Sequence, residues 1–161
     1  MIHIKAPQKI PESNNLKIFL AGSIEMGTAE EWQEYVADKL QPEEVLLLNP
    51  RRDDWDSTWL QVKENPEFKK QVEWELDSLA KSDYIILYFD RETKSPISLL
   101  EMGLFAQSGK LLVVCPEGFW RKGNVDIVCE KYGFLQFETI DNLLDYVIPL
   151  IKNYNQHFLT K

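Results

Sequence analysis

The chain has 161 residues, a length typical of one domain, and a formal net charge of −8 at pH 7. This acidic balance argues against binding to a nucleic-acid polymer, although a local arginine cluster can still hold the phosphate of a small ligand. No stretch has the length of a membrane span, no signal pattern opens the chain, and Cys115 and Cys129 lack a disulfide framework spacing. We therefore expect a cytoplasmic protein with no membrane partner.

The chain alternates short apolar runs with amphipathic segments. Residues 1–15 carry turn-forming residues and predict a loose lead-in, and residues 16–155 predict one domain. Strands are predicted at 17–21, 45–48, 84–89, 111–115 and 134–137, and helices at 28–40 (capped by Thr28), 66–81, 96–109 and 139–154 (kinked or broken near Pro149). This pattern predicts a doubly wound α/β domain, a flavodoxin- or Rossmann-like parallel sheet of about five strands with helices on both faces.

In such a domain the ligand crevice lies beyond the carboxyl ends of the strands. Gly22 and Ser23 follow the first predicted strand, where small residues let backbone amides approach a ligand. Asn49 and Arg51 follow the second strand, and Asp90 follows the third. The topology therefore gathers these five residues at one edge of the sheet as candidate substrate contacts.

Two longer loops leave the same edge. The loop at 50–65 contains Asp54, Trp55 and Trp59, a mixture of charged and aromatic residues that could stack on a base and hydrogen-bond its edges, or could form a solvated surface. The segment after the fourth strand contains Arg121, which could meet a phosphate, and Asn124, which could orient a carboxylate. Alternatively, the aromatic residues of that segment pack at an oligomer interface.

Glu101 is the most informative candidate. The segment 95–103 reads as a helix start, with Ser95 as the N-cap and Pro96 as the first helical residue. On that register Glu101 falls within a predicted inward stripe formed by Ile97, Leu100, Leu104 and Phe105. A carboxylate there is either catalytic at a cleft or a structural group tied to an arginine or a backbone amide.

Glu75 is the second unusual carboxylate. It lies on or beside the predicted inward face of helix 66–81, which carries Phe68, Val72, Leu76 and Leu79. Paired carboxylates serve glycosyl transfer, one as the nucleophile and one as the proton handler, although such a pair can also merely shape a core. No metal site and no histidine-based triad are expected, because His3 and His157 lie near the ends of the chain.

Together these features resemble the nucleoside 2-deoxyribosyltransferase family, including its deoxynucleoside 5′-monophosphate N-glycosidase branch, over roughly residues 16–130. The resemblance rests on the turn at Gly22, on Glu75 eight positions before Asp83, and on the helix start that leads to Glu101 and Gly103. This chain departs from the family in the bulky residues 96–100, where glycines are usual, and in Glu rather than Asp at position 75.

The resemblance implies a role for each matching residue. Glu101 corresponds to the nucleophile that attacks C1′, and Glu75 to the residue that helps to transfer a proton to the base. Ser95, followed one turn later by Ser98, is expected to contact the ligand, and Asn124 to reach the site of a neighbouring subunit. A homodimer or higher homo-oligomer with shared active sites is therefore implied.

The expected activity is cleavage of the N-glycosidic bond of a (deoxy)nucleoside or nucleotide through a covalent glycosyl intermediate on Glu101. The sugar is then transferred to another base or to water, as in nucleotide salvage, and no cofactor is expected. Three alternatives remain open: a non-catalytic nucleotide-binding module, a glycohydrolase of a nicotinamide dinucleotide, and a scaffold protein that uses Trp74 and Trp120 as interface anchors.

Overall fold

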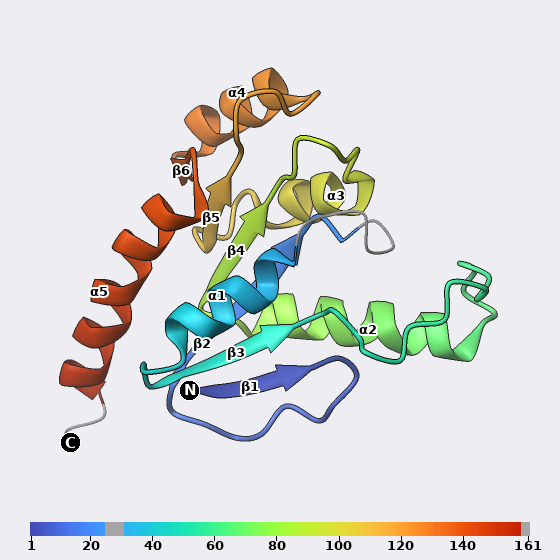
Figure 1. Cartoon of the computed structure of the whole chain (residues 1–161), viewed down its shortest axis with the longest axis horizontal. Helices are drawn as coiled ribbons and strands as arrows, with labels where there is room; N and C mark the ends of the chain where they lie inside the picture. Colours follow the sequence, from blue (N-terminus) through green and yellow to red (C-terminus); the bar gives the residue numbers. More distant parts are fainter. Residues whose placement is uncertain (25–30, 159–161) are drawn as a thin grey trace.

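The computed structural model describes residues 1–24 and 31–158, so the predicted helix cap Thr28 lies outside the described residues. One parallel sheet has the strand order β1-β3-β2-β4-β5-β6 (Figure 1). Its strands are β1 (Ile2–Lys5), β2 (Leu16–Gly22), β3 (Val45–Asn49), β4 (Tyr84–Tyr88), β5 (Leu111–Val114) and β6 (Leu135–Phe137). The helices are α1 (Trp32–Leu40), α2 (Pro66–Lys81), α3 (Pro96–Phe105), α4 (Lys122–Tyr132) and α5 (Ile140–Phe158).

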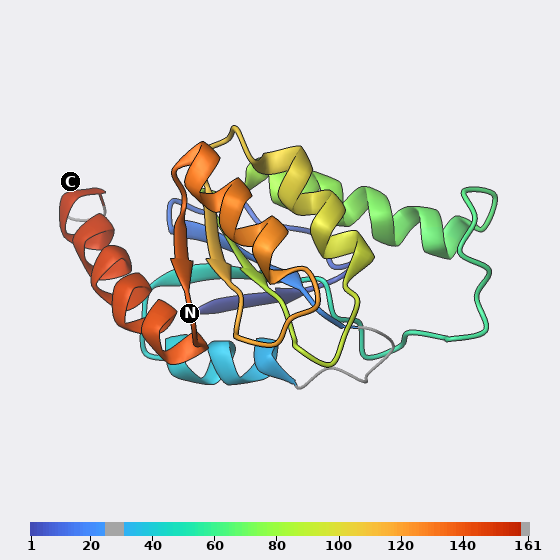
Figure 2. The same ribbon diagram turned by 90° about the horizontal axis from the view of Figure 1, so that it is seen from above.

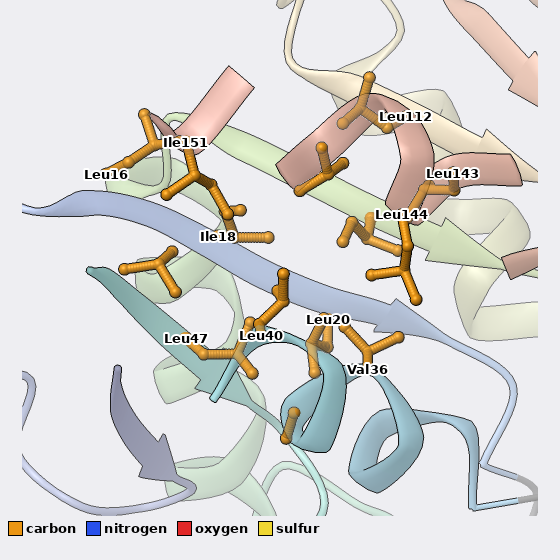
Figure 3. Packing of buried hydrophobic residues seen from close by; sticks show 14 of the residues in the cluster. Leu16, Ile18, Leu20, Val36, Leu40, Leu47, Leu112, Leu143, Leu144 and Ile151 are labelled. Atoms are coloured by element: carbon orange, nitrogen blue, oxygen red, sulfur yellow. The ribbon is translucent and has the colours of Figure 1, made fainter. Parts of the chain in front are cut away.

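The molecule has three layers. Helices α1 and α5 cover one face of the sheet, and α2, α3 and α4 cover the other (Figure 2). Successive residues of β2 enter opposite cores, because side chains alternate along a strand. Ile18 and Leu20 pack with α1 and α5 (Figure 3), whereas Phe19 and Ala21 pack under α2 and α3. The predicted doubly wound α/β fold is thereby confirmed.

The N-terminal segment contributes a sixth strand. Residues 2–5 form β1, which pairs in parallel with β3, so that Ile2 lies beside Leu46 and Lys5 beside Asn49. The lead-in predicted for residues 1–15 therefore contains a strand, and the sheet has six strands where about five were predicted. Strand β1 escapes a search for continuous apolar runs because Ile2 and Ile4 alternate with polar residues, as expected for an edge strand.

Two helices also differ from the prediction. Helix α4 begins at Lys122, within the segment 115–125 that was expected to be a loop, and continues through residues 126–132, for which no element was predicted; it ends at Gly133 in the left-handed conformation (φ 72°). Helix α5 continues unbroken through Pro149 as far as Phe158, because Leu143, Val147 and Ile151 are buried along one side of it. Within residues 1–24 and 31–158, no helix combines the length and the apolar composition that crossing a membrane requires.

Candidate active site

The floor of the site lies at the carboxyl end of β2. Gly22 has φ 138°, and a Cβ atom added there would lie 2.3 Å from the backbone oxygen of Tyr88. The residue must therefore be glycine for β2 to pair closely with β4. Gly22 thus has a structural role, and its contact with substrate stays a prediction.

Ser23 is part of a buried cluster of hydroxyl groups. Its Oγ accepts hydrogen bonds from the backbone N–H of Asp90 (2.9 Å) and from Oγ1 of Thr93 (3.0 Å), and it also contacts Oγ of Ser95. Thr93 Oγ1 in turn lies 2.7 Å from Ser95 Oγ. The cluster joins the end of β2 to the start of α3, so Ser23, Asp90 and Ser95 are brought together as predicted. Because Ser23 is engaged on several sides, its position favours a role in shaping the site.

Helix α3 begins at Pro96, and Ser95 (φ 48°) is its N-cap residue, as predicted, although the Ser95 side chain makes no capping hydrogen bond. Its inward face differs from the prediction: Ile97, Leu100 and Leu104 are 60%, 58% and 57% exposed. The buried residues of the helix are instead Ser98, Glu101 and Met102. Nearly every residue of α3 is apolar, so periodicity does not single out one face, and the polar residues that turn inward belong to the site.

The two candidate carboxylates come from helices on the same face of the sheet, and both helices pack on β2. Glu101 is 9% exposed. Burial raises the pKa of Glu101 to about 8, and the negative charge of Glu75 adds to this effect. Burial also raises the pKa of Glu75 to about 7. Helices α2 and α3 thus bring the two carboxyl groups close enough for the charge of Glu75 to affect the pKa of Glu101.

Glu101 forms no ion pair within the described part of the chain. Among the residues that the structure describes, no arginine or backbone amide forms an ion pair or hydrogen bond with its carboxyl group. Ser98, one turn earlier on the same helix, is also buried. Two polar side chains of α3 therefore lie on its buried side.

Gln71 joins Glu75 to the end of β3. Its Nε2 donates hydrogen bonds to Oε1 of Glu75 (2.7 Å) and to the backbone oxygen of Pro50 (2.8 Å). Sequence reasoning missed this residue, although its position one helical turn before Glu75 puts the two side chains on one face of α2. Thr93 was missed as well, since a loop threonine carries no distinctive pattern.

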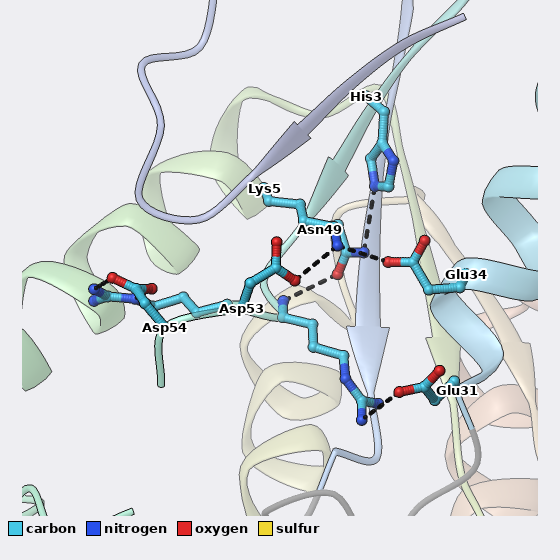
Figure 4. A network of polar contacts seen from close by, with 9 residues as sticks. His3, Lys5, Glu31, Glu34, Asn49, Asp53 and Asp54 are labelled. Atoms are coloured by element: carbon cyan, nitrogen blue, oxygen red, sulfur yellow. Dashed lines mark hydrogen bonds and ion pairs between the residues drawn. The ribbon is translucent and has the colours of Figure 1, made fainter. Parts of the chain in front are cut away.

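Asn49 is the last residue of β3 (Figure 4), and Arg51 follows two residues later. Asn49 is fully buried; its Oδ1 accepts the backbone N–H of Arg51 (2.9 Å), and its amide nitrogen lies 3.3 Å from Nε2 of His3. The guanidinium of Arg51 reaches Glu31 at 3.4 Å. Its Nη1 is buried without a hydrogen-bond partner in the described part of the chain. Asn49 therefore supports the turn, and Arg51 has a free donor for a ligand.

The loop that contains Asp54 and Trp55 lies elsewhere. The Arg52 guanidinium binds Asp54 through two hydrogen bonds of 2.9 Å, stacks over the Trp59 ring, and reaches Glu67 at 3.5 Å. Trp55 packs edge-on against Trp59. Both views show this loop beyond the sheet, at the outer end of α2 (Figures 1 and 2). Glu67, which the loop contacts through Arg52, precedes Glu75 by eight residues, roughly 12 Å along a helix. Within a single protomer, Asp54 and Trp55 therefore do not lie beside Glu101.

Arg121 and Asn124 lie at the start of α4 and are exposed. The Arg121 guanidinium covers the ring of Trp120, whose other cationic neighbour is Lys94. Trp74, the second proposed anchor of the scaffold alternative, packs on Phe19 and donates to the backbone oxygen of Gln8. Across the described residues, no three His, Cys, Asp or Glu side chains gather as a metal ion would require.

The fold and the site define a class: a doubly wound α/β domain in which α2 and α3, on one face of the sheet, carry two carboxyl groups with raised pKa values. A family model described as nucleoside 2-deoxyribosyltransferase like matches residues 15–119, and the chain belongs to this family. Membership indicates an enzyme of glycosyl transfer or hydrolysis. The crystal structure of a conserved protein from Enterococcus faecalis V583 is similar in fold, with a TM-score of 0.58 and 14% identity, over 81% of this chain and 96% of that chain. A search of curated protein sequences finds no significant match.

Proposed function

We propose that the protein cleaves the N-glycosidic bond of a (deoxy)nucleoside or nucleotide through a covalent glycosyl intermediate on Glu101. The observation that carries this proposal is the environment of Glu101: a buried carboxyl group without an ion-pair partner among the described residues, coupled to the carboxyl group of Glu75. A structural glutamate would be expected to have a cation or backbone donors around it.

The chemistry has two displacement steps. An oxygen of ionised Glu101 attacks C1′ and forms a C–O bond, while the C1′–N bond breaks and its electron pair moves to the base. Protonated Glu75 gives its proton to the leaving base. In the second step a new base or a water molecule attacks C1′, the bond to Glu101 breaks, and Glu75 accepts the proton of the incoming nucleophile.

Substrate contacts are proposed for the polar groups that the fold leaves available near this pair. Ser98 lies one turn before Glu101 on the buried side of α3, and Arg51 has a buried Nη1 without a partner in the described part of the chain. Arg51 would suit an anionic or carbonyl group of the substrate. Ser95 and Asp90 would line the same edge from the β4–α3 connection.

We further propose that the active form is a homodimer or larger homo-oligomer with shared sites. The outer side of α3 exposes Ile97, Leu100 and Leu104, and α2 in the same layer exposes Leu76. Large apolar side chains gathered on adjacent helices favour a protein partner. A second copy docked there would bring Asn124 from the exposed start of α4 toward the neighbouring crevice.

A substrate panel tests the proposed activity. All deoxynucleosides, their monophosphates and NAD would be incubated with the protein, with and without a free acceptor base, and released or exchanged bases would be measured. Replacing Glu101 by Gln should lower turnover by at least about 10³-fold. Glu73→Gln, an exposed change on α2, is the matched control and should be neutral.

Trapping the intermediate locates the nucleophile. Mass spectrometry of protein quenched during turnover should find one glycosyl group on the peptide that contains Glu101. Wild-type turnover by Glu101→Gln would refute the assignment. Thermal stabilisation by nucleotides without any turnover would favour a binding module instead, and selective cleavage of NAD would favour a dinucleotide glycohydrolase.

A further inference from the structure

Gln71 has a fixed amide orientation inside the protein. The residue is 4% exposed, and its Nε2 lies 2.8 Å from the backbone oxygen of Pro50 and 2.7 Å from Oε1 of Glu75. A backbone carbonyl can only accept a hydrogen bond, so the nitrogen end of the amide must face Pro50. Both N–H groups of Gln71 are then used, one toward Pro50 and the other toward Glu75.

This orientation makes the two oxygens of Glu75 different. Oε1 accepts a hydrogen bond from the Gln71 N–H, so a proton on Oε1 would face another hydrogen-bond donor. The proton of a neutral Glu75 therefore resides on Oε2. We propose that Gln71 is a positioning residue that keeps the Glu75 proton on Oε2, the oxygen that delivers it to the leaving base. This inference rests on the proposed function.

The proton transfer is balanced. As the C1′–N bond breaks, the electron pair on the base nitrogen takes the proton from Oε2, the O–H bond breaks, and Glu75 becomes a carboxylate. The hydrogen bond from Gln71 to Oε1 stabilises this new negative charge and lowers the pKa of Glu75, against the larger, opposite effect of burial. Glu75 can thereby lose its proton and be protonated again near neutral pH.

Other charges around Glu75 are few or already paired. The charge of Glu75 affects the pKa of Glu101 on α3. Among the ion pairs of the described residues, the arginines that follow β3 pair with other carboxylates, Arg51 with Glu31 through Nη2, and Arg52 with Asp54 and Glu67. Gln71 is therefore the group through which the protein acts most directly on the Glu75 proton.

The test replaces Gln71 by Met, which has a similar length and no donor. With a natural nucleoside, kcat should fall about 10- to 100-fold, because protonation of the base is impaired. With a 4-nitrophenyl deoxyriboside, whose leaving group departs without a proton, the loss should be less than about threefold. The acidic limb of the pH profile should move up by roughly one pH unit, because the pKa of Glu75 loses its lowering hydrogen bond.

Gln107→Met, an exposed change just after α3, is the matched control and should leave both substrates and the pH profile unchanged. Should Gln71→Met fail to fold, Gln71→Leu serves in its place, since it also has no donor and should shift the profile in the same direction. Equal losses on the two substrates with an unmoved acidic limb would overturn the proposal and leave Gln71 a purely structural residue.

A readout without turnover separates this inference from the proposed function. The carboxyl carbon of Glu75 can be titrated by ¹³C NMR in the Glu101→Gln protein, with and without Gln71→Met. A raised titration midpoint supports the positioning role, and identical midpoints overturn it, whether or not the protein is active. A wild-type protein that is inert toward the whole nucleoside panel would instead overturn the proposed function.

Discussion

Glu75 and Glu101 ionise in an order that matters for the proposed chemistry. With pKa values of about 7 for Glu75 and about 8 for Glu101, the first proton to leave the pair is mostly that of Glu75. Nucleophilic attack needs the reverse, a charged Glu101 and a protonated Glu75. Because part of the difference arises from the charge of Glu75 itself, a fraction of the singly protonated pairs has the reactive arrangement.

This coupling predicts a narrow bell-shaped pH dependence. Below about pH 7 both carboxyl groups hold protons and the nucleophile is missing; above about pH 8 both are charged and the acid is missing. The kcat/KM of the wild-type protein should therefore rise through about pH 7 and fall through about pH 8. Steady-state kinetics from pH 5 to 10 at constant ionic strength would check this, and a flat profile over that range would contradict it.

The raised pKa of Glu101 also predicts a stability cost at high pH. The unfolded chain releases this proton near pH 4.5, whereas the folded protein holds it to about pH 8. The free energy of unfolding therefore falls as pH rises between these values. Glu101→Gln should match the wild type at pH 5 and be about 2–4 kcal/mol more stable at pH 9.

Urea unfolding at the two pH values measures the difference. Glu73→Gln, which removes an exposed carboxylate on the same helix as Glu75, should show no comparable pH-dependent gain. A Glu101→Gln protein that is equally destabilised at pH 5 and pH 9 would mean that the carboxyl group is structural.

At the scale of elements, the pairing of β2 with β4 depends on one glycine. A methyl group at Gly22 would press on the backbone of Tyr88, and the backbone of residue 22 is in a conformation that side chains disfavour. Gly22→Ala should destabilise the protein by roughly 2–4 kcal/mol. Gly103→Ala is the control: it lies in α3 with open space around the new Cβ, and it should be neutral or stabilising by about 0.5–1 kcal/mol. Chemical denaturation of both variants gives the comparison.

The sequence predicted the central elements well, because each has a strong local pattern. The strands β2, β3, β4, β5 and β6 are continuous apolar runs or end beside clear turn residues, and α2 spans Pro66–Lys81 as expected. The position of α2 and α3, which carry Glu75 and Glu101, on one face of the sheet is also understandable from the sequence, since sequential helices on one face of a doubly wound sheet are neighbours.

Elements with weak local patterns were missed. Strand β1 is short and lies at the edge of the sheet, so its stability comes from pairing with β3 rather than from its own residues. Helix α4 has only Val125 and Cys129 fully buried, which is too little for periodicity to detect. The support that Gln71 gives to Glu75 depends on where Pro50 lies in space, which no pattern along the chain reveals.

For the whole molecule, the exposed side of α3 is the decisive feature. Leu100→Glu combined with Leu104→Glu should convert the proposed oligomer into single chains and lower activity at least tenfold, because charges would be buried at the interface and the Asn124 of a neighbour would be lost. Analytical ultracentrifugation and the base-release assay measure the two effects. Phe158→Glu, an equally exposed apolar site on α5, is the control and should alter neither. A wild-type protein that is fully active as a monomer would contradict shared sites.

The strand order has a consequence for how the chain reaches this structure. No neighbouring strands are joined by a tight turn: Ile18 lies beside Tyr84, and Ile2 lies beside Leu46. Each pair of neighbouring strands can therefore form its hydrogen bonds only after a long connecting segment has closed into a loop. The chain loses the conformational entropy of that segment before the strand pairing stabilises it. Refolding from denaturant should accordingly take milliseconds to seconds, and it should lose yield to aggregation as protein concentration rises, while bare sheet edges wait for their partners.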